Sequence, residues 1–301
     1  MMVHLLQIPL LPACSLGCYG EQRFATPCFD TLAAQSTVFN HYYSNDELAF
    51  EPSEGLTVHR WAVPEPELDR LLNAAECWLN AEQWQQLLST ESHDSESHDS
   101  AAGSVERLWD VCPKSLHATV QATALALTYD DALGEWVDGM SFSPNDVLMI
   151  VGQSGDVRRR PESCPAWLAE VSEPVVHLPL LIHQIGQQEH QRVEEAISTK
   201  SLLRRVRDFA LRKQEDQQTD LTSFLAQSPE EEILWDLPNC RARRSKDWLI
   251  VERLDSTEEA FEQNDVALFR KPEDLWDLLN VASQHPERVE RSLDQLRRIG
   301  R

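Results

Sequence analysis

Apolar runs that alternate with helical segments constrain the fold of this chain most strongly. Three runs, at Val3–Leu11, Asp146–Gly152 and Val175–His183, are apolar at almost every position. Strands that are buried on both faces of a parallel sheet have this continuous pattern, whereas half-exposed strands alternate. Helices predicted at Pro66–Leu88 and Leu116–Met140 lie between these strands. The order predicts an α/β protein with a mainly parallel sheet between helix layers.

The remaining elements complete this prediction. Thr26 is the expected N-cap of a helix that starts at Pro27, because a hydroxyl and a following proline both favour a helix start. Extended segments are predicted at Val38–Tyr43, Trp248–Leu254 and Val266–Phe269, and helices at Ser198–Leu211 and Pro286–Arg298. We predict two domains. Residues 1–228 form the α/β core, with a disordered polar loop at about 90–104, and residues 229–301 form a small C-terminal α+β part.

The acidic charge of the chain argues against two classes of partner, nucleic acids and anionic membrane surfaces. The 301 residues include 27 Lys and Arg but 50 Asp and Glu, which gives a net charge of −23. Nucleic-acid binding requires clustered basic residues, so no nucleic-acid partner is expected. No apolar run reaches the length of a membrane span. The seven cysteines include no C-x-x-C pair, which argues against a zinc ribbon.

The N-terminal segment leaves two localisations open. Leu5–Cys14 loosely resembles a short signal or lipoprotein segment. However, no Lys or Arg precedes it, and Pro9 and Pro12 interrupt it. A buried first strand explains the same residues, so we expect a cytoplasmic protein and keep the secretory or lipoprotein reading as the alternative.

Several segments together resemble the start and later parts of a known family. Leu16–Gly20 reads LGCYG, Ala25–Ala34 reads ATPCFDTLAA, and Val38–Ser44 reads VFNHYYS. Asp146–Asp156 (DVLMIVGQSGD) and Leu268–Ala282 (LFRKPEDLWDLLNVA) follow in the same order. These segments resemble the sulfatase family, of the alkaline phosphatase-like superfamily, and residues from about 45 to 115 do not. The resemblance indicates a shortened and degenerate member.

The resemblance implies a fold and an activity. It implies a large mixed sheet between helix layers with a smaller C-terminal sheet and helix. In active members it implies hydrolysis of sulfate esters. Such enzymes hold a divalent cation, usually calcium, with an Asp-Asp pair after the first strand and an Asp-His or Asp-Asn pair after a later one. Their nucleophile is a formylglycine made from the first residue of a C/S-x-P-S-R motif.

This chain departs from the family at both parts of that site. Ungapped alignment puts Pro9 and Leu10 at the first metal-ligand pair, and Gln153 and Ser154 at the second. A hard cation requires oxygen ligands that include carboxylates, which none of these four residues provides. We therefore interpret them as degenerate metal positions and expect no bound metal or other cofactor.

The nucleophile region is degenerate as well. Pro52 and Ser53 match the Pro-Ser of the motif, but Phe50 stands where the Cys or Ser should be. Glu54 stands where the arginine should be, which reverses the charge. Without a metal and a nucleophile, nothing would stabilise the charge that develops during ester hydrolysis.

These departures predict a catalytically inactive protein that acts by binding or as a scaffold. Its partner would be a sulfated carbohydrate or a protein. The alternative is a divergent sulfuric or phosphoric ester hydrolase with a relocated site, for which calcium would be expected. Candidate anion contacts of that site are Arg158, Arg159, Arg160, His177 and His183.

Overall fold

The computed structural model describes the chain in eight segments, which fall into two compact units. The segments are residues 2–45, 50–53, 55–91, 114–159, 164–212, 221–226, 230–254 and 265–299. The first unit comprises Met1–Ala13, Gln35–Trp61 and Ser143–Arg301, and the second comprises Cys14–Ala34 and Ala62–Phe142. Within the described segments, no helix combines the length and the apolar character that a bilayer span requires.

The centre of the first unit is a mixed six-stranded sheet. Its strands, in spatial order, are β4 (Leu56–Arg60), β1 (Val3–Ile8), β5 (Val147–Gly152), β7 (Leu180–Gln184), β2 (Thr37–Phe39) and β8 (Gln191–Val193). The first three strands are parallel, β7 is antiparallel to both of its neighbours, and β2 and β8 are parallel. The α/β class and the mixed, mainly parallel sheet predicted from the sequence are confirmed.

The segment predicted as one strand at Val175–His183 is divided into three elements, so that prediction is wrong in detail. It contains the end of α6 (Glu173–Val176), then β6 (His177–Leu178), and then most of β7. Pro179 separates the two strands, and because proline has no N–H it cannot continue a ladder. The predicted strand Val38–Tyr43 is divided likewise, and its second half becomes β3 (Tyr42–Tyr43). The three short strands form a second sheet in the order β6-β3-β9, with β9 at Ile197–Ser198.

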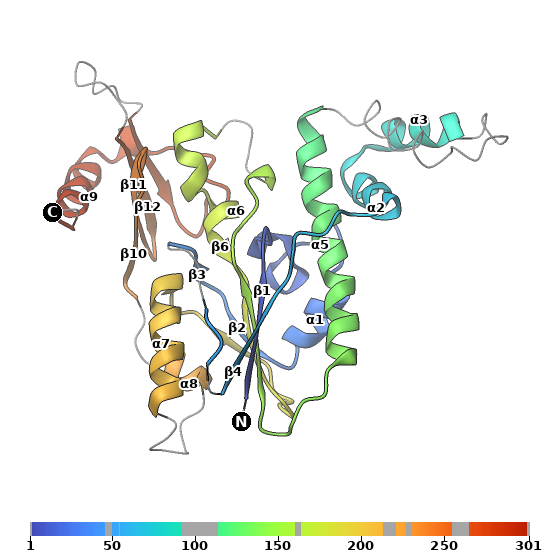
Figure 1. Ribbon diagram of the computed structural model, residues 1–301. Coiled ribbons are helices and arrows are strands. Elements are labelled where there is room, and N and C mark those ends of the chain that lie inside the picture. Colours follow the sequence, from blue (N-terminus) through green and yellow to red (C-terminus); the bar gives the residue numbers. More distant parts are fainter. Residues whose placement is uncertain are drawn as a thin grey trace. The chain divides into compact units, whose positions relative to one another are not determined.

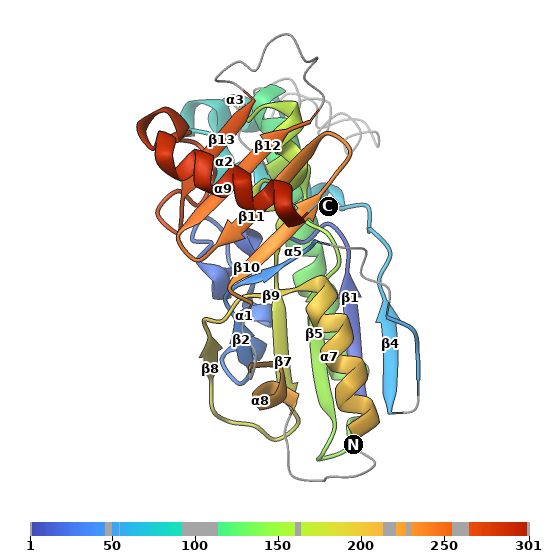
Figure 2. The ribbon, with the colours of Figure 1, turned by 90° about the vertical axis from the view of Figure 1, so that its left-hand side faces the viewer.

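One face of the central sheet packs against α7 (Thr199–Arg212) and α8 (Leu221–Ala226), as Figure 2 shows. Leu5, Met149 and Ile182 on that face contact the buried helix side chains Leu202 and Val206. Residues of even spacing along each strand share this face, because side chains alternate across a strand. The core of the first unit therefore lies directly beneath the strands that carry the predicted site.

The C-terminal part of the first unit is an antiparallel sheet with one helix. Its strands, in order, are β10 (Glu232–Asp236), β11 (Cys240–Ser245), β12 (Trp248–Arg253) and β13 (Val266–Arg270), followed by α9 (Pro286–Ile299). One face packs against η4 (Ala166–Val171) and α6, and the other packs against α9 (Figure 1). This sheet starts close to the predicted boundary after residue 228, which stays a prediction because both parts belong to one compact unit.

The second unit is helical. It contains α1 (Pro27–Ala33), α2 (Leu68–Trp78), α3 (Ala81–Glu91) and α5 (Lys114–Gly139). The helix predicted at Pro66–Leu88 is interrupted at Leu79, whose backbone is extended. The predicted loop at about 90–104 lies outside the described residues after Glu91.

The start of α1 is capped by a residue distant in sequence. The Thr26 hydroxyl accepts a hydrogen bond from the Gly17 N–H instead of capping the helix. The Asp130 carboxylate from α5 accepts hydrogen bonds from the N–H groups of Cys28 and Phe29, 3.2 and 2.9 Å away. Thr26 therefore occupies the predicted position, but the capping group is Asp130.

Candidate functional site

The four residues predicted as degenerate metal positions lie together at the carboxyl ends of β1 and β5. These strands are parallel neighbours, so the residues that follow them leave the sheet at the same edge. The Leu10 N–H donates to Ser154 Oγ at 3.0 Å. The Gln153 N–H donates to the carbonyl oxygen of Ile8 at 2.8 Å. The segments Pro9–Leu10 and Gln153–Ser154 thus lie side by side, while their assignment as former metal positions stays a prediction.

The chemistry of this edge does not fit a hard cation. Leu10 adopts φ 51°, in the left-handed region that non-glycine residues seldom occupy. This turn directs its N–H, a hydrogen-bond donor, at the Ser154 hydroxyl, which therefore acts as an acceptor. Carboxylates, the main ligands of calcium, are absent from all four positions. Among the described residues there is also no group of three or more His, Cys, Asp or Glu side chains that could hold a metal ion.

The loop after Ser154 packs tightly against α6. The N–H groups of Gly155 and Asp156 donate to the carbonyl oxygens of Val175 and Pro174, both at 3.0 Å. A Cβ atom at Gly155 would lie 2.2 Å from the carbonyl oxygen of Pro174, so this approach requires glycine. The edge that carries the predicted site is therefore joined directly to α6.

Arg158, a predicted anion contact, is neutralised within the same loop. Its guanidinium contacts both carboxylate oxygens of the buried Asp156, at distances from 2.7 to 3.0 Å. Arg159 is itself buried in η3 (Val157–Arg159), and Arg160 lies outside the described residues. The arginine run therefore does not present three available charges to an anion.

The predicted nucleophile region lies at the opposite end of the sheet. Ser53 forms a bridge with Leu56, and Leu56 pairs with Val3 at the start of β1. Pro9 and Leu10 follow the other end of that strand. Phe50 is buried in the core, Pro52 is exposed, and Glu54 lies outside the described residues. The structure does not bring Pro52 and Ser53 to the edge that holds the degenerate metal positions.

The two predicted histidines also lie apart. His183 pairs with Leu148 near the start of β5, and its Nδ1 is 2.8 Å from the carbonyl oxygen of Gln35. His177 lies near the carboxyl end of β5, directly after α6. Its Nε2 is 2.8 Å from the carbonyl oxygen of Asn40, and its Nδ1 is 3.2 Å from Glu173 Oε1. His177 therefore links the backbone at Asn40 to the carboxylate of Glu173.

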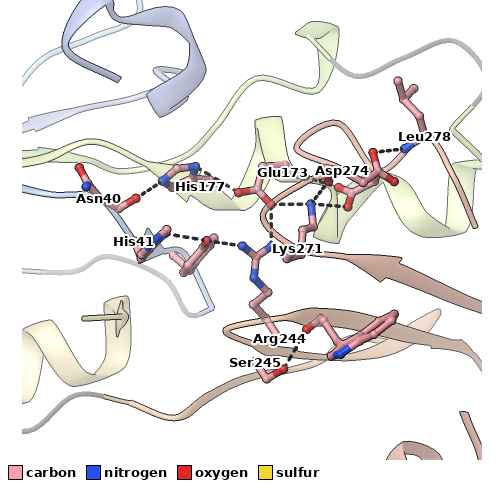
Figure 3. Close-up of polar contacts among 12 residues, drawn as sticks. Asn40, His41, Glu173, His177, Arg244, Ser245, Lys271, Asp274 and Leu278 are labelled. Carbon is pink, nitrogen blue, oxygen red and sulfur yellow. Dashed lines mark hydrogen bonds and ion pairs between the residues drawn. The ribbon is translucent and has the colours of Figure 1, made fainter. Parts of the chain in front are cut away.

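Glu173 belongs to a buried charge cluster that the sequence did not reveal (Figure 3). Lys271 Nζ lies 3.0 Å from Glu173 Oε2 and 2.7 Å from Asp277 Oδ1, and the lysine side chain is fully buried. Arg244 Nη1 lies 2.9 Å from the same Glu173 oxygen. Asp277 Oδ2 in turn accepts from the Glu173 N–H at 2.8 Å. Two cations and two carboxylates therefore balance each other in the interior.

The environment of this cluster shifts its pKa values in opposite directions. Burial alone would raise the pKa of Glu173, but Arg244 and Lys271 outweigh it and hold that pKa well below its usual range. Burial raises the pKa of Asp277 to about 6, although the nearby Lys271 ammonium acts against this shift. Two carboxylates that share Lys271 thus differ in how readily they lose a proton.

Tyr43 and His41 extend the cluster towards β3. Arg244 Nη2 donates to the Tyr43 hydroxyl at 2.8 Å, and the arginine also lies over the tyrosine ring. Burial is the main cause of the raised pKa of Tyr43. The Glu173 carboxylate raises this pKa further, and the Arg244 guanidinium acts against the rise. Burial, together with His177 and Arg244, lowers the pKa of His41. These groups stabilise the junction of α6, β3 and the antiparallel sheet.

Comparison with known proteins identifies the architecture. No protein-family model and no curated protein matches the chain. Among solved structures, a protein in complex with its substrate D-glucosamine-2-N,6-O-disulfate aligns with a TM-score of 0.61 and 10% identity, over 99% of this chain and 97% of that one. A 2-O GAG sulfatase aligns with a TM-score of 0.58 and 11% identity, over 99% and 91%. The chain has the sulfatase fold.

This fold is shared beyond sulfate esterases. The phosphonate monoester hydrolase of Agrobacterium radiobacter aligns with a TM-score of 0.54 and 10% identity, over 98% of this chain and 94% of that one. The fold that the sequence resemblance implied is therefore confirmed. At these identities the likeness concerns architecture alone, so its chemistry has to be argued from its own residues.

A signal for part of the buried cluster was present in the sequence. In β11, Cys240, Ala242 and Arg244 alternate with Arg241, Arg243 and Ser245. An arginine that shares a face with cysteine and alanine is a candidate for burial. The partners of Arg244, Glu173 and Tyr43, come from distant segments, and no local pattern connects them.

Proposed function

We propose that this sulfatase-fold protein lacks ester hydrolysis and acts by binding. The observation that carries the proposal is the set of residues that follow β1 and β5 at one edge of the sheet. Pro9, Leu10, Gln153 and Ser154 meet there, and none of them provides a carboxylate. A hydrolase of this family type would use a cation there to neutralise the ester and stabilise the transition state.

The hydrogen bond between Leu10 and Ser154 supports this proposal. It closes the edge with a neutral backbone donor and a neutral hydroxyl. A cation at the same place would face the Leu10 N–H, which carries a partial positive charge. The residues present therefore do not fit calcium, and no catalytic step is assigned to a metal.

The position of the nucleophile region gives a second line of support. Ser53 lies beside the start of β1, and its N–H donates to the carbonyl oxygen of Leu56. Phe50 is buried, and its carbonyl oxygen accepts from Arg60. Neither group is placed to attack an ester at the opposite edge of the sheet.

The ligand class follows from the comparison and remains part of the proposal. One structural neighbour has D-glucosamine-2-N,6-O-disulfate as its substrate. Sulfated carbohydrates are therefore the first class to test as ligands of this chain, and proteins are the second. Arg158 is already paired with Asp156, so the strand edge itself is a weak place for a sulfate group.

Turnover and metal content test the proposal directly. The purified full chain would be assayed on 4-nitrophenyl sulfate and 4-nitrophenyl phosphate, with and without calcium, and its metal content measured by elemental analysis. We expect no turnover above buffer and no stoichiometric calcium. Turnover that His177→Gln abolishes and His190→Gln preserves would overturn the proposal and establish the relocated hydrolytic site instead. His190 is the matched control because it is an exposed histidine that directly precedes β8.

A restoration variant sharpens the same test. The variant Pro9→Asp/Leu10→Asp/Gln153→Asp/Ser154→Asn places the family's ligand types at this edge. If these four positions are a former metal site, the variant should bind calcium where the natural chain does not. Calcium-dependent stabilisation against thermal unfolding would report this binding. A folded variant without such stabilisation would contradict the assignment of the edge.

A further inference from the structure

A basic pocket lies between α9 and the face of the antiparallel sheet that packs on this helix. Its volume is about 190 Å³, and its lining includes Arg243, Arg288, Arg291, Trp248, Ser292 and Gln295. The strands β11 and β12 form one wall and α9 forms the other, and the views from two sides agree that these elements are neighbours (Figures 1 and 2). No acidic side chain is among the described residues that line it.

The sequence explains why arginines gather here. Along β11, the neighbours Ala242 and Arg244 point to the face that packs against η4 and α6. Arg243 therefore points to the opposite face, on which α9 lies. On α9, Arg288 and Arg291 are three residues apart and therefore lie on the same side of the helix. Leu293 and Leu296 of the same helix pack into the core, which fixes the helix against the sheet.

The three arginines differ in how far their charge is neutralised. Arg243 contacts both carboxylate oxygens of Glu232, and this hydrogen bonding lowers the pKa of Glu232. Arg288 lies over the Trp248 ring, 4.6 Å from its centroid. Among the described residues, no carboxylate lies within ion-pair distance of Arg288 or Arg291. Within the described part of the chain, Arg288 and Arg291 therefore carry charges that no carboxylate neutralises.

This concentration of positive charge contrasts with the chain as a whole. The net charge is −23, whereas residues 241–301 carry 12 basic and 13 acidic side chains. Two unneutralised guanidinium groups at one cavity repel each other unless an anion separates them. A guanidinium matches the paired oxygens of a sulfate, phosphate or carboxylate, and such charge-assisted hydrogen bonds are strong.

We propose that this pocket binds the tetrahedral oxyanion group of a small sulfate or phosphate ester. The guanidinium groups of Arg288 and Arg291 donate hydrogen bonds to the oxygens of that group. Contact with Trp248 holds Arg288 in place, and Gln295 and Ser292 supply further polar groups beside it. The cavity is smaller than the roughly 300–1,000 Å³ of pockets that enclose whole drug-sized molecules. It therefore takes the charged group of the ligand while the remainder stays outside.

The pocket is built from the antiparallel sheet and α9, whereas the residues that do not fit hydrolysis lie at the ends of β1 and β5. Anion binding at α9 therefore does not depend on whether the chain hydrolyses esters. Detection of ester turnover would overturn the proposed function and leave anion binding at α9 to be decided by its own measurement.

Calorimetric titration of the full chain with inorganic sulfate, inorganic phosphate and glucosamine 6-sulfate, at constant ionic strength in chloride buffer, tests the pocket. We expect saturable binding that the variant Arg288→Gln/Arg291→Gln weakens about tenfold or more, because two charge-assisted contacts are lost. Arg298→Gln is the matched control, since it removes the same charge from the same helix outside the lining. It should leave the affinity within about twofold of the original.

The outcomes separate the possibilities. Preference for sulfate or for phosphate among the three probes identifies the source of the oxyanion. The proposal fails if the natural chain shows no saturable binding of any probe. It also fails if the double variant binds as well as the natural chain, or if Arg298→Gln weakens binding equally. Thermal unfolding of each variant checks that the exposed substitutions leave the fold intact.

Discussion

The two faces of the antiparallel sheet hold arginines in opposite situations. On one face, Arg244 is buried with Lys271 against Glu173 and Asp277. On the other, Arg288 and Arg291 line an open pocket without a described carboxylate as partner. A buried charge must be paired to be tolerated, whereas a charge at the surface can remain available. The presence of an arginine therefore does not by itself mark a binding site. An arginine is a candidate for anion binding only where its side chain is exposed and its charge is not already paired with a carboxylate.

The largest expected effect is on the buried side of this comparison. Lys271→Met should lower the free energy of unfolding by about 3–5 kcal/mol, because it leaves Asp277 buried without its cation. Lys246→Met, at an exposed position in the β11–β12 hairpin, should change it by less than about 0.5 kcal/mol. Urea denaturation at pH 7 measures both. A loss below about 1 kcal/mol for Lys271→Met would contradict a paired, desolvated cluster.

The second effect is on pH dependence. The pKa of Asp277 is raised from its usual 3.8 to about 6, so the folded chain keeps a proton there that the unfolded chain releases. Stability from this group is therefore lost as pH rises from about 4 to 6. Glu173 has a lowered pKa and contributes in the opposite sense, with its stability lost as pH falls below about 4.5.

The variant Asp277→Asn isolates this contribution. Between pH 4.5 and 6, we expect the difference in unfolding free energy between the natural chain and the variant to change by about 1.5 kcal/mol. The natural chain should lose relative stability as pH rises in this window. Denaturant titrations at several pH values measure it. A difference that stays constant with pH would show that Asp277 keeps an ordinary pKa.

A smaller effect is expected at the hydroxyl of Tyr43. Tyr43→Phe removes the acceptor of the 2.8 Å hydrogen bond from Arg244 and keeps the ring in place. The loss should be about 1–2 kcal/mol, because a buried guanidinium donor is left unsatisfied. Tyr19→Phe, in a half-buried position, serves as the control for removal of a tyrosine hydroxyl. Equal losses of unfolding free energy for both variants would show that the hydrogen bond from Arg244 to Tyr43 contributes no particular stability.

The smallest effect on stability is expected on the open side. Arg288→Gln and Arg291→Gln should each change the free energy of unfolding by no more than about 0.5 kcal/mol, since both side chains are exposed. Measured in parallel with anion affinity, this result would separate binding from structure. A loss similar to that of Lys271→Met would mean that the pocket arginines stabilise the fold. The proposed difference between the two faces of the sheet would then be wrong.

Prediction from the sequence succeeded where a pattern is local. The buried strands β1 and β5 and the helices α7 and α9 follow from continuous or periodic apolar positions. Division of the predicted strand Val175–His183 at Pro179 was missed, although proline was a visible signal against one continuous ladder. The hydrogen bond between Leu10 and Ser154 could not be predicted from the sequence, because it depends on the left-handed turn at Leu10 and on the neighbouring strand.

The sequence by itself determined the class of fold and the residues that stand at the carboxyl ends of β1 and β5. Only the tertiary structure decided which charges are neutralised. Arg158 is paired with Asp156 two residues away, but Arg244 is paired with Glu173, which is 71 residues away in the chain. Arg243 and Arg244 are adjacent in the chain and separated by the sheet itself. Alternation along a strand sends neighbours to opposite faces, and the packing of each face decides which arginine is buried and which lines a pocket.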